Sequence, residues 1–265
     1  MDRTIELVNS VKDIQAMPSV IVKVLSLMKK PTVNMKELSD IVIYDQSLAI
    51  KILALVNSAY YGFSQQISSV NIALSLLGMV KVKNIIVAVA MKPMMSSAGD
   101  KELWKHSIRV ATGCEYLAKL TKIMDSDEAF ISGFIHDIGK IVLNMSDNKL
   151  YAKVVNAVSK GSDVLETEKK AFDSDHVKTG SLLAKRWQLP ILLTNIVSYH
   201  HNPNLSSIPI PCNLVYTVDK ILQEEPNLEL LDKNFLKTMG LTIDDIDELR
   251  QVILHKSELM ISELS

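Results

Sequence analysis

The 265-residue sequence is poor in cysteine and in aromatic residues, and it has no excess of charge of either sign. Its two cysteines, Cys114 and Cys212, form no Cys-x-x-Cys pair and lie in apolar helical patterns, which favours buried, reduced thiols in a cytosolic protein. Lys and Arg number 29 against 30 Asp and Glu, so the net charge of −1 gives no general attraction to polyanions. We therefore expect no direct nucleic-acid binding. A nucleotide or phosphate ligand would have to be held by a local site.

Signals for export and membrane insertion are also missing. The N-terminus, MDRTIELVNSVKDIQ, interleaves acids and bases and has no basic region followed by an apolar one, as a signal peptide would. Apolar runs such as IIVAVAM stop far short of the roughly 20 residues that a membrane span needs. We expect a cytoplasmic protein without a membrane partner.

What the sequence does have is apolar character at helical spacing. Hydrophobic residues make up 48% of the chain and recur every three or four positions, whereas strict alternation is almost absent. The pattern predicts an all-α fold. Helices are expected to start at Met17-Pro18, after the cap Asp45, at Ser68-Ser69, at Pro211 and after the cap Thr242, and one should end at Gly78. The very apolar stretch 79–95 should lie in the core.

The composition turns small and polar at SSAG, residues 96–99, which indicates a boundary between two helical layers. A second helical portion is expected from about Lys101 to Glu224. Within it, the Pro-rich stretch NPNLSSIPIP at 202–211 predicts a loop.

The stretch FIHDIGKIV places His136 and Asp137 side by side in a helix expected over 126–144, which is apolar on several sides and therefore buried. A buried carboxylate costs several kcal/mol unless a cation or hydrogen-bond donors compensate for it. Adjacent helical residues diverge by about 100°, so the pair can share a metal only if the side chains converge or the helix is distorted. Gly133 and Gly139, on either side, would let partner helices approach closely.

Other histidines and acids also fall on apolar helical faces. His106 continues an inward stripe, with Glu102 one turn before it, and Asp219 lies among valines and isoleucines. Each remaining candidate has a plain alternative: His176 as a solvent-facing residue at a helix N-terminus, and His200 with His201 as cation-like groups at a helix C-terminus. His255 is expected on the surface.

In combination, five histidines and two or three carboxylates on separate helices, without cysteine, match the ligands of Fe, Mn, Zn or Mg. They suffice for two divalent ions.

The order of these side chains resembles a known ligand series. His106, His136 with Asp137, His176, His200 with His201, and Asp219 follow the H…HD…H…HH…D order of the HD phosphohydrolase superfamily. The segments AMPSVIVKVLSLM, LVNSAYYGFSQQISSVNIALSLLG and LAKRWQLP with SYHHNP resemble the HDOD family, an HD-related output domain of bacterial signalling proteins. This resemblance implies an HDOD domain over 13–209. The domain begins with an N-terminal helical subdomain at 13–97. An HD-like subdomain follows at 98–224, and it extends past the end of the HDOD core to include Asp219. A helical tail is expected at 225–265.

The related HD-GYP phosphodiesterases hold two or three metal ions on this series and hydrolyse cyclic di-GMP. The chain is similar to them in Glu102, four residues before the first His, and in Lys140, three after the Asp. It departs from them after His201, where NPNLSSIPIP replaces the GYP motif, and after Asp219, where DKILQEEPN replaces their DAxTxxRPY segment. The resemblance thus implies that the metal site persists and that the cyclic di-GMP pocket does not. The implied metal ligands are His106, His136, Asp137, His176, His200, His201, Asp219 and Glu102.

Two functions are compatible with this reading. The first is a regulatory signal-transduction protein that carries a metal site and acts through a signalling protein partner; the His/Asp cluster would serve there as a polar core or a ligand sensor. The alternative is a metal-dependent phosphohydrolase of a phosphomonoester or a cyclic or linear nucleotide phosphodiester. In that case Asp137 would bridge two ions, a bridging water would attack phosphorus in line, and Lys140 would steady a phosphate oxygen.

Overall fold

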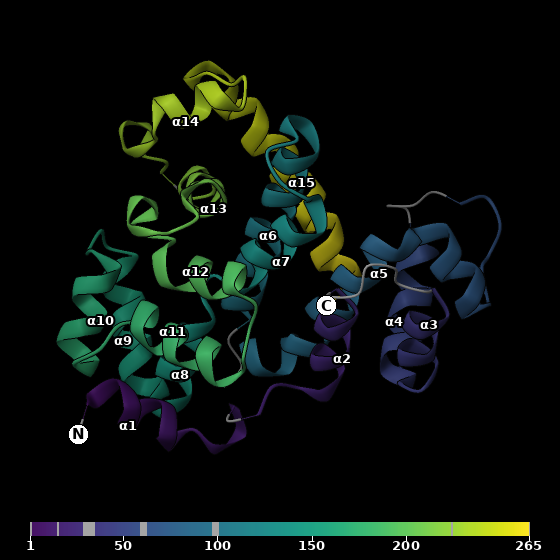
Figure 1. Cartoon of the computed structure of the whole chain (residues 1–265), viewed down its shortest axis with the longest axis horizontal. Helices are drawn as coiled ribbons and strands as arrows, with labels where there is room; N and C mark the ends of the chain where they lie inside the picture. The colour runs from purple at the N-terminus through teal and green to yellow at the C-terminus, as the bar shows by residue number, and fades with distance from the viewer. Residues whose placement is uncertain are drawn as a thin grey trace. The chain divides into compact units, whose positions relative to one another are not determined.

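The computed structural model describes residues 2–14, 16–28, 35–58, 63–96, 101–223 and 225–264. Figure 1 shows helices joined by loops, and the described ranges contain no strand, which confirms the all-α prediction. Of the SSAG segment expected to mark a boundary, residues 97–99 lie outside the described ranges, as do residues 59–62 of the NSAYYG motif.

The chain divides into two compact units. We call Met1–Ala16 with Pro93–Ile246 the 93–246 unit, and Met17–Lys92 with Asp247–Ser265 the 17–92 unit. The domain limits expected from the sequence, at 13–97, 98–224 and 225–265, stay predictions.

The 17–92 unit contains α2 (Ser19–Met28), α3 (Met35–Ile43), α4 (Gln46–Val56) and most of α5 (Val70–Met95) and α15 (Ile246–Leu264). The carboxylate of Asp45 accepts the Leu48 N–H at 3.1 Å and caps α4, as expected. Gly78, at φ +77°, interrupts α5 where a helix end was expected, because glycine tolerates this left-handed backbone. Thr242 and Asp245 form a capping box at a 3₁₀ turn, Ile243–Asp245, that leads into α15.

Among the described helices, only α5 is long and apolar enough to cross a membrane. Of its most apolar stretch, 61% is buried inside the protein, and Val82, Ile85 and Ile86 are almost fully enclosed. This burial and the break at Gly78 favour a core helix, which agrees with the core position expected for residues 79–95.

The 93–246 unit packs its helices around Trp104, Phe130 and Phe134, all of which are buried. Helix α6 (Glu102–Thr121) packs on α7 (Ser126–Ile135), and α11 (His176–Arg186) packs on α8 (Ile138–Ser146) and α12 (Ile191–Tyr199). The helices are α1 (Arg3–Ser10), α6 (Glu102–Thr121), α7 (Ser126–Ile135), α8 (Ile138–Ser146), α9 (Asn148–Val158), α10 (Val164–Phe172), α11 (His176–Arg186), α12 (Ile191–Tyr199), α13 (Pro209–Ile221) and α14 (Lys233–Thr238), with 3₁₀ turns at Lys12–Ile14, Pro203–Leu205 and Leu228–Leu230.

Two sequence expectations about helix limits are wrong. The single helix expected over 126–144 is broken: α7 ends at Ile135, α8 begins at Ile138, and Asp137 adopts φ −98° and ψ 16° between them. Helix α13 begins at Pro209 rather than Pro211. A proline at the first helical position gives up only an N–H that would have no partner inside the helix, so the earlier start costs nothing.

Candidate metal centre

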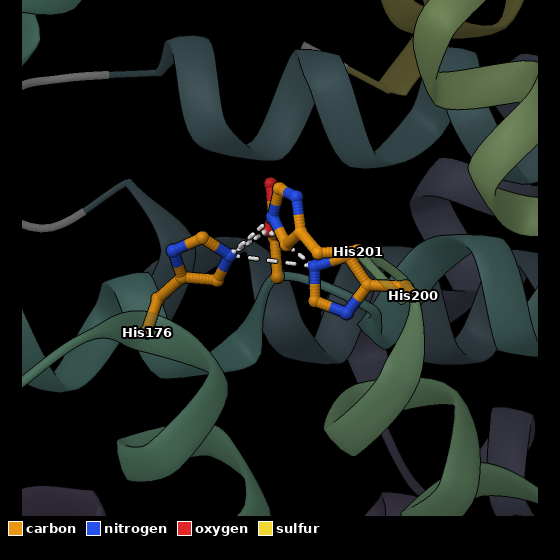
Figure 2. Close-up of side chains that lie close together, drawn as sticks. His176, His200 and His201 are labelled. Carbon is orange, nitrogen blue, oxygen red and sulfur yellow. Dashed lines mark hydrogen bonds and ion pairs between the residues drawn. The ribbon is translucent and has the colours of Figure 1, made fainter. Parts of the chain in front are cut away.

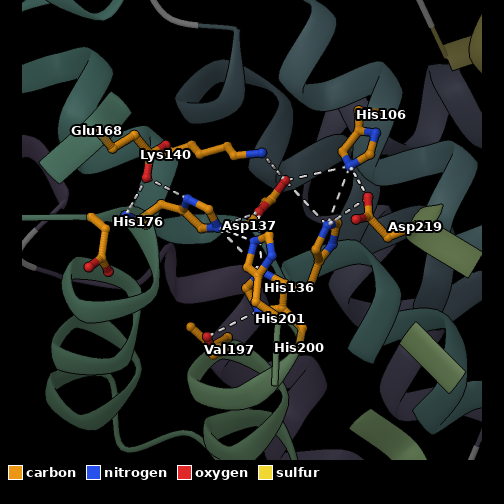
Figure 3. A network of polar contacts seen from close by, with 12 residues as sticks. His106, His136, Asp137, Lys140, Glu168, His176, Val197, His200, His201 and Asp219 are labelled. Atoms are coloured by element: carbon orange, nitrogen blue, oxygen red, sulfur yellow. Dashed lines mark hydrogen bonds and ion pairs between the residues drawn. The ribbon is translucent and has the colours of Figure 1, made fainter. Parts of the chain in front are cut away.

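Seven of the predicted ligands meet in the 93–246 unit (Figure 3). His106 comes from α6, His136 and Asp137 from the joint between α7 and α8, His176 from the first position of α11, His200 and His201 from the end of α12, and Asp219 from α13. Two groups have ligand atoms that all lie within 4.8 Å of one another: Asp137 with His176, His200 and His201, which we call the His176 side, and Asp137 with His106 and His136. Because Asp219 also reaches the second group, we call that group with Asp219 the His106 side.

Asp137 turns one carboxylate oxygen toward each side. Its Oδ2 lies 3.2 Å from His136 Nε2 and 3.5 Å from His106 Nε2. Its Oδ1 lies 3.3 Å from His176 Nε2 and 3.5 Å from His200 Nε2, yet no hydrogen bond reaches this buried atom among the described residues. Only 2% of the side chain is exposed. A buried carboxylate oxygen surrounded by ring nitrogens, none of which donates to it, is typical of a metal ligand.

The opposite ring nitrogens explain why no donor is available. His136 Nδ1 lies 2.7 Å from the Gly133 carbonyl oxygen, and His200 Nδ1 lies 3.2 Å from the carbonyl oxygens of Ile196 and Val197. His176 Nδ1 lies 2.6 Å from a carboxylate oxygen of Glu168. The carbonyl oxygens only accept, and Glu168 Oε2 also accepts the main-chain N–H of His176, so each Nδ1 donates. A neutral ring of this tautomer presents a lone pair at Nε2.

The Nε2 atoms of the cluster face one another. His176 Nε2 lies 3.0 Å from His201 Nε2 and 3.3 Å from His200 Nε2. Figure 2 labels these three residues. On the His106 side, His106 Nε2 and His136 Nε2 are 3.3 Å apart. On the His176 side, the lone pairs of His176 and His200 repel at 3.3 Å unless something positive lies between them. The donor set of neutral imidazoles and a carboxylate fits a borderline divalent cation.

Protonation on the His176 side favours ligation. Burial lowers the pKa of His176 and of His200, and it lowers the pKa of His201 to about 2, so these rings are neutral near pH 7. Burial works against the ionised form of Asp137, but His136 and Lys140 outweigh it and hold the Asp137 pKa well below its ordinary value. Metal binding requires neutral imidazoles and an ionised carboxylate, and the His176 side supplies both.

On the His106 side the acids are charged and one ring is protonated. Burial alone would lower the pKa of His106, but Asp137 and Asp219 outweigh it and raise this pKa to about 9. Asp219 Oδ1 lies 3.2 Å from His106 Nε2, and this contact lowers the Asp219 pKa despite the opposing effect of burial. In the cation-free protein, a proton on His106 thus supplies the positive charge that these carboxylates attract.

Glu102 and Lys140 are placed differently from the seven ligands. Glu102 belongs to neither ligand group; its carboxylate pairs with Lys105 at 2.6 Å and is 67% exposed. The structure therefore does not bring Glu102 to the cluster. Lys140 is 20% exposed, and its Nζ lies 2.6 Å from Asp137 Oδ2.

Glycines let the ligand helices approach closely, as the sequence led us to expect. A Cβ on Gly133 would come within 2.9 Å of the Ala111 Cα and the Val110 carbonyl oxygen of α6. A Cβ on Gly139 would come within 1.8 Å of the His176 carbonyl oxygen on α11. Because α7 and α8 pack on different helices through these glycines, the chain bends between them at His136 and Asp137.

Glu168 was not singled out from the sequence. It lies on α10 with a fully buried side chain, and burial raises its pKa to about 7. The sequence feature that could have pointed to Glu168 is its position, three residues after Leu165 and four before Phe172, which places an acid on the apolar face of the helix.

The plain alternatives for the histidines are also decided by burial. His176 is fully buried and Asp175 occupies the capping position, so His176 is not a solvent-facing cap. His200 is 2% exposed and is no solvated cation at a helix end. His255 is exposed, as expected.

Comparison with known proteins supplies the family. The HDOD domain matches residues 14–203 of this chain. An uncharacterized protein of Treponema pallidum (strain Nichols) is 27% identical over 201 residues, which cover 72% of this chain and 38% of that protein. The chain therefore spans about two fifths of the length of this curated relative.

Solved structures share the fold. An HDOD domain protein of unknown function from Geobacter sulfurreducens superposes with a TM-score of 0.79 at 21% identity, covering 99% of this chain and 94% of that one. A candidate phosphohydrolase from Shewanella amazonensis SB2B superposes with a TM-score of 0.73 at 21% identity, covering 99% of this chain and 98% of that one.

Proposed function

Since the chain belongs to the HDOD family, we propose that it is a cytoplasmic bacterial signal-transduction protein whose regulatory state depends on a divalent metal site in the 93–246 unit. It would pass its signal to a protein partner. The observation that supports the metal site is the convergence of Nε2 lone pairs on Asp137. Three of these rings, His136, His176 and His200, are held in the ligating tautomer by acceptors at Nδ1.

Each side of Asp137 offers ligands for one ion. His176, His200 and His201 would hold a cation with Asp137 Oδ1, and His106, His136 and Asp219 would hold another with Oδ2. Fe, Mn, Zn and Mg are the candidate cations, and the nitrogen-rich His176 side favours the first three over Mg. Each bound cation would help to neutralise the buried carboxylate and would tie two helices to the joint between α7 and α8.

The enclosure of the cluster supports the regulatory role. The side chains of His136, Asp137, His176 and His200 are each at most 2% exposed. The sequence also lacks the GYP motif and the arginine-containing segment with which related phosphodiesterases hold cyclic di-GMP. A buried site without those segments is better suited to sensing or stabilising than to turning over a large dinucleotide.

The alternative is a metal-dependent phosphohydrolase of a small phosphomonoester or nucleotide phosphodiester. It is favoured by the partial exposure of His106 at 31%, of Lys140 at 20% and of Asp219 at 15%. The description of the Shewanella protein as a candidate phosphohydrolase agrees with it. Metal ions in such sites activate water and stabilise charge on phosphate oxygens. Lys140 Nζ lies 2.6 Å from Asp137 Oδ2 and would hold a phosphate oxygen.

Elemental analysis of the full chain purified without chelator tests the metal site. We expect at least one Fe, Mn or Zn per chain in the wild type and well under one in Asp137→Asn. Wild-type protein that carries no metal and takes up none of these ions after dialysis would contradict the proposal.

A hydrolysis screen then separates the two functions. The metal-loaded protein is assayed with cyclic dinucleotides, nucleoside monophosphates and a chromogenic phosphomonoester. The regulatory proposal expects no turnover above that of Asp137→Asn. Steady turnover that is lost in Asp137→Asn would support the phosphohydrolase instead.

A further inference from the structure

One oxygen of Glu168 accepts two hydrogen bonds from the same residue. Glu168 Oε2 lies 2.6 Å from His176 Nδ1 and 2.8 Å from the backbone nitrogen of His176. Both side chains are fully buried. Because the ring and the main chain of His176 meet on a single atom, Glu168 fixes the rotation of the imidazole relative to the start of α11 (Figure 3).

No other ring in the cluster is held in this way among the described residues. His136 and His200 direct Nδ1 to main-chain carbonyl oxygens three or four residues earlier in their own segments. Glu168 instead reaches His176 from α10, eight residues earlier in the chain. A carboxylate on Nδ1–H makes Nε2 a stronger donor to a metal than a neutral carbonyl does.

We infer that Glu168 is a positioning residue that sets the metal affinity of the His176 side without setting that of the His106 side. The inference rests on the proposed metal site. The ring that Glu168 holds belongs to the His176 side, because His176 Nε2 lies 3.3 Å from Asp137 Oδ1 and 3.0 Å from His201 Nε2. Among the described residues, no hydrogen bond or ion pair joins Glu168 to His106, His136 or Asp219.

The test is a titration of the chelator-stripped full chain with Mn²⁺ and, separately, with Zn²⁺, in which free ion is measured. Replacing a residue that orients a metal ligand typically costs about 10–100-fold in affinity. We expect a loss of this size for Glu168→Ala at one class of site. Glu168→Gln should lose less, because an amide oxygen can still accept both N–H groups.

Glu166→Gln is the matched control. Glu166 lies on the same helix, is 73% exposed, and pairs with Lys170 at 3.5 Å. Its replacement removes an identical charge from α10, and it should leave both affinities within about twofold, as expected for an exposed ion pair. Far-ultraviolet circular dichroism of the metal-free variants checks that they fold, and Glu168→Gln keeps the test valid if Glu168→Ala does not.

Combining the Glu168 variants with a second substitution shows on which side of Asp137 Glu168 acts. In Asp219→Asn, which weakens the His106 side, Glu168→Gln and Glu168→Ala should still reduce the remaining affinity. In His201→Ala, which weakens the His176 side, they should change the remaining affinity by less than threefold. Equal losses of metal affinity in both backgrounds, or no loss in the wild-type background, would overturn the role of Glu168. Neither result would contradict the metal site. A wild-type chain that binds neither Mn²⁺ nor Zn²⁺ would contradict the metal site itself.

Discussion

Replacing Gly139 with alanine should damage the protein more than replacing any other glycine near the cluster. The new Cβ would lie 1.8 Å from the His176 carbonyl oxygen and 2.6 Å from the Gly180 nitrogen. The shorter distance is about 1.6 Å below the 3.4 Å at which ordinary contact begins. Both neighbours are main-chain atoms, so no side chain can rotate away and α8 must separate from α11.

The expected cost follows from this geometry. Overpacking a core usually costs about 1–3 kcal/mol, and a clash with main chain belongs at the upper end, so we expect about 3 kcal/mol for Gly139→Ala. Gly180→Ala is the comparator in the same interface. Its Cβ would approach a methyl group of Val197 at 2.8 Å and the Gly139 nitrogen at 3.1 Å. Because these overlaps are smaller than those of Gly139→Ala, we expect about 1 kcal/mol.

Urea unfolding of the two variants and the wild type, in chelator, measures both values. Trp104 and Trp187 are the only tryptophans in the sequence and both belong to the 93–246 unit, so their fluorescence reports the unit that contains the cluster. Because His176 must move with α11, Gly139→Ala should also weaken metal binding. If Gly139→Ala costs less than about 1 kcal/mol, or no more than Gly180→Ala, the inferred close packing of α8 on α11 is wrong.

Three other outcomes are expected. In Asp137→Asn, added Mn²⁺ should no longer raise the melting temperature as it does in the wild type; a retained rise would mean that Asp137 is not a ligand. Lys140→Met should bind Mn²⁺ more tightly in titrations, since an ammonium 2.6 Å from Asp137 Oδ2 competes with a cation, and weaker binding would show that Lys140 supports the site instead. Hydrogen bonds from Thr242 lower the pKa of Asp245, so this cap adds stability above pH 3.8 that is lost as the pH falls through the lowered value. Comparing Asp245→Asn with wild type in unfolding at pH 6 and pH 3 checks this, and equal differences at both pH values would refute it.

The sequence allowed the helical fold and most candidate ligands to be predicted for a simple reason. Helix caps such as Asp45 and breaks such as Gly78 act on residues within one turn, so they can be read locally. The ligand order could be recognised because its members are rare residue types on apolar helices. Seven of the eight predicted ligands meet in space.

The features that the sequence did not predict depend on contacts between segments that are far apart in the chain. Nothing near residue 136 marks a helix end, and the joint exists because Gly133 and Gly139 press against α6 and α11 respectively. Glu102 has helical spacing suitable for a shared ligand set, but its first-turn position lets it pair with Lys105. Glu168 becomes relevant only when α10 is folded against the start of α11.

The order of the two units along the chain limits how the protein can be divided. The chain passes from one unit to the other after Ala16, after Lys92 and after Ile246, and the last two crossings fall inside α5 and α15. Neither unit is therefore an uninterrupted stretch of sequence, and no single proteolytic cut releases either one. A chain shortened to end before Asp247 would lose part of the 17–92 unit although the cut lies more than 150 residues further on. Because the segments of the two units alternate even when the chain ends are joined, circular permutation does not make either unit continuous either.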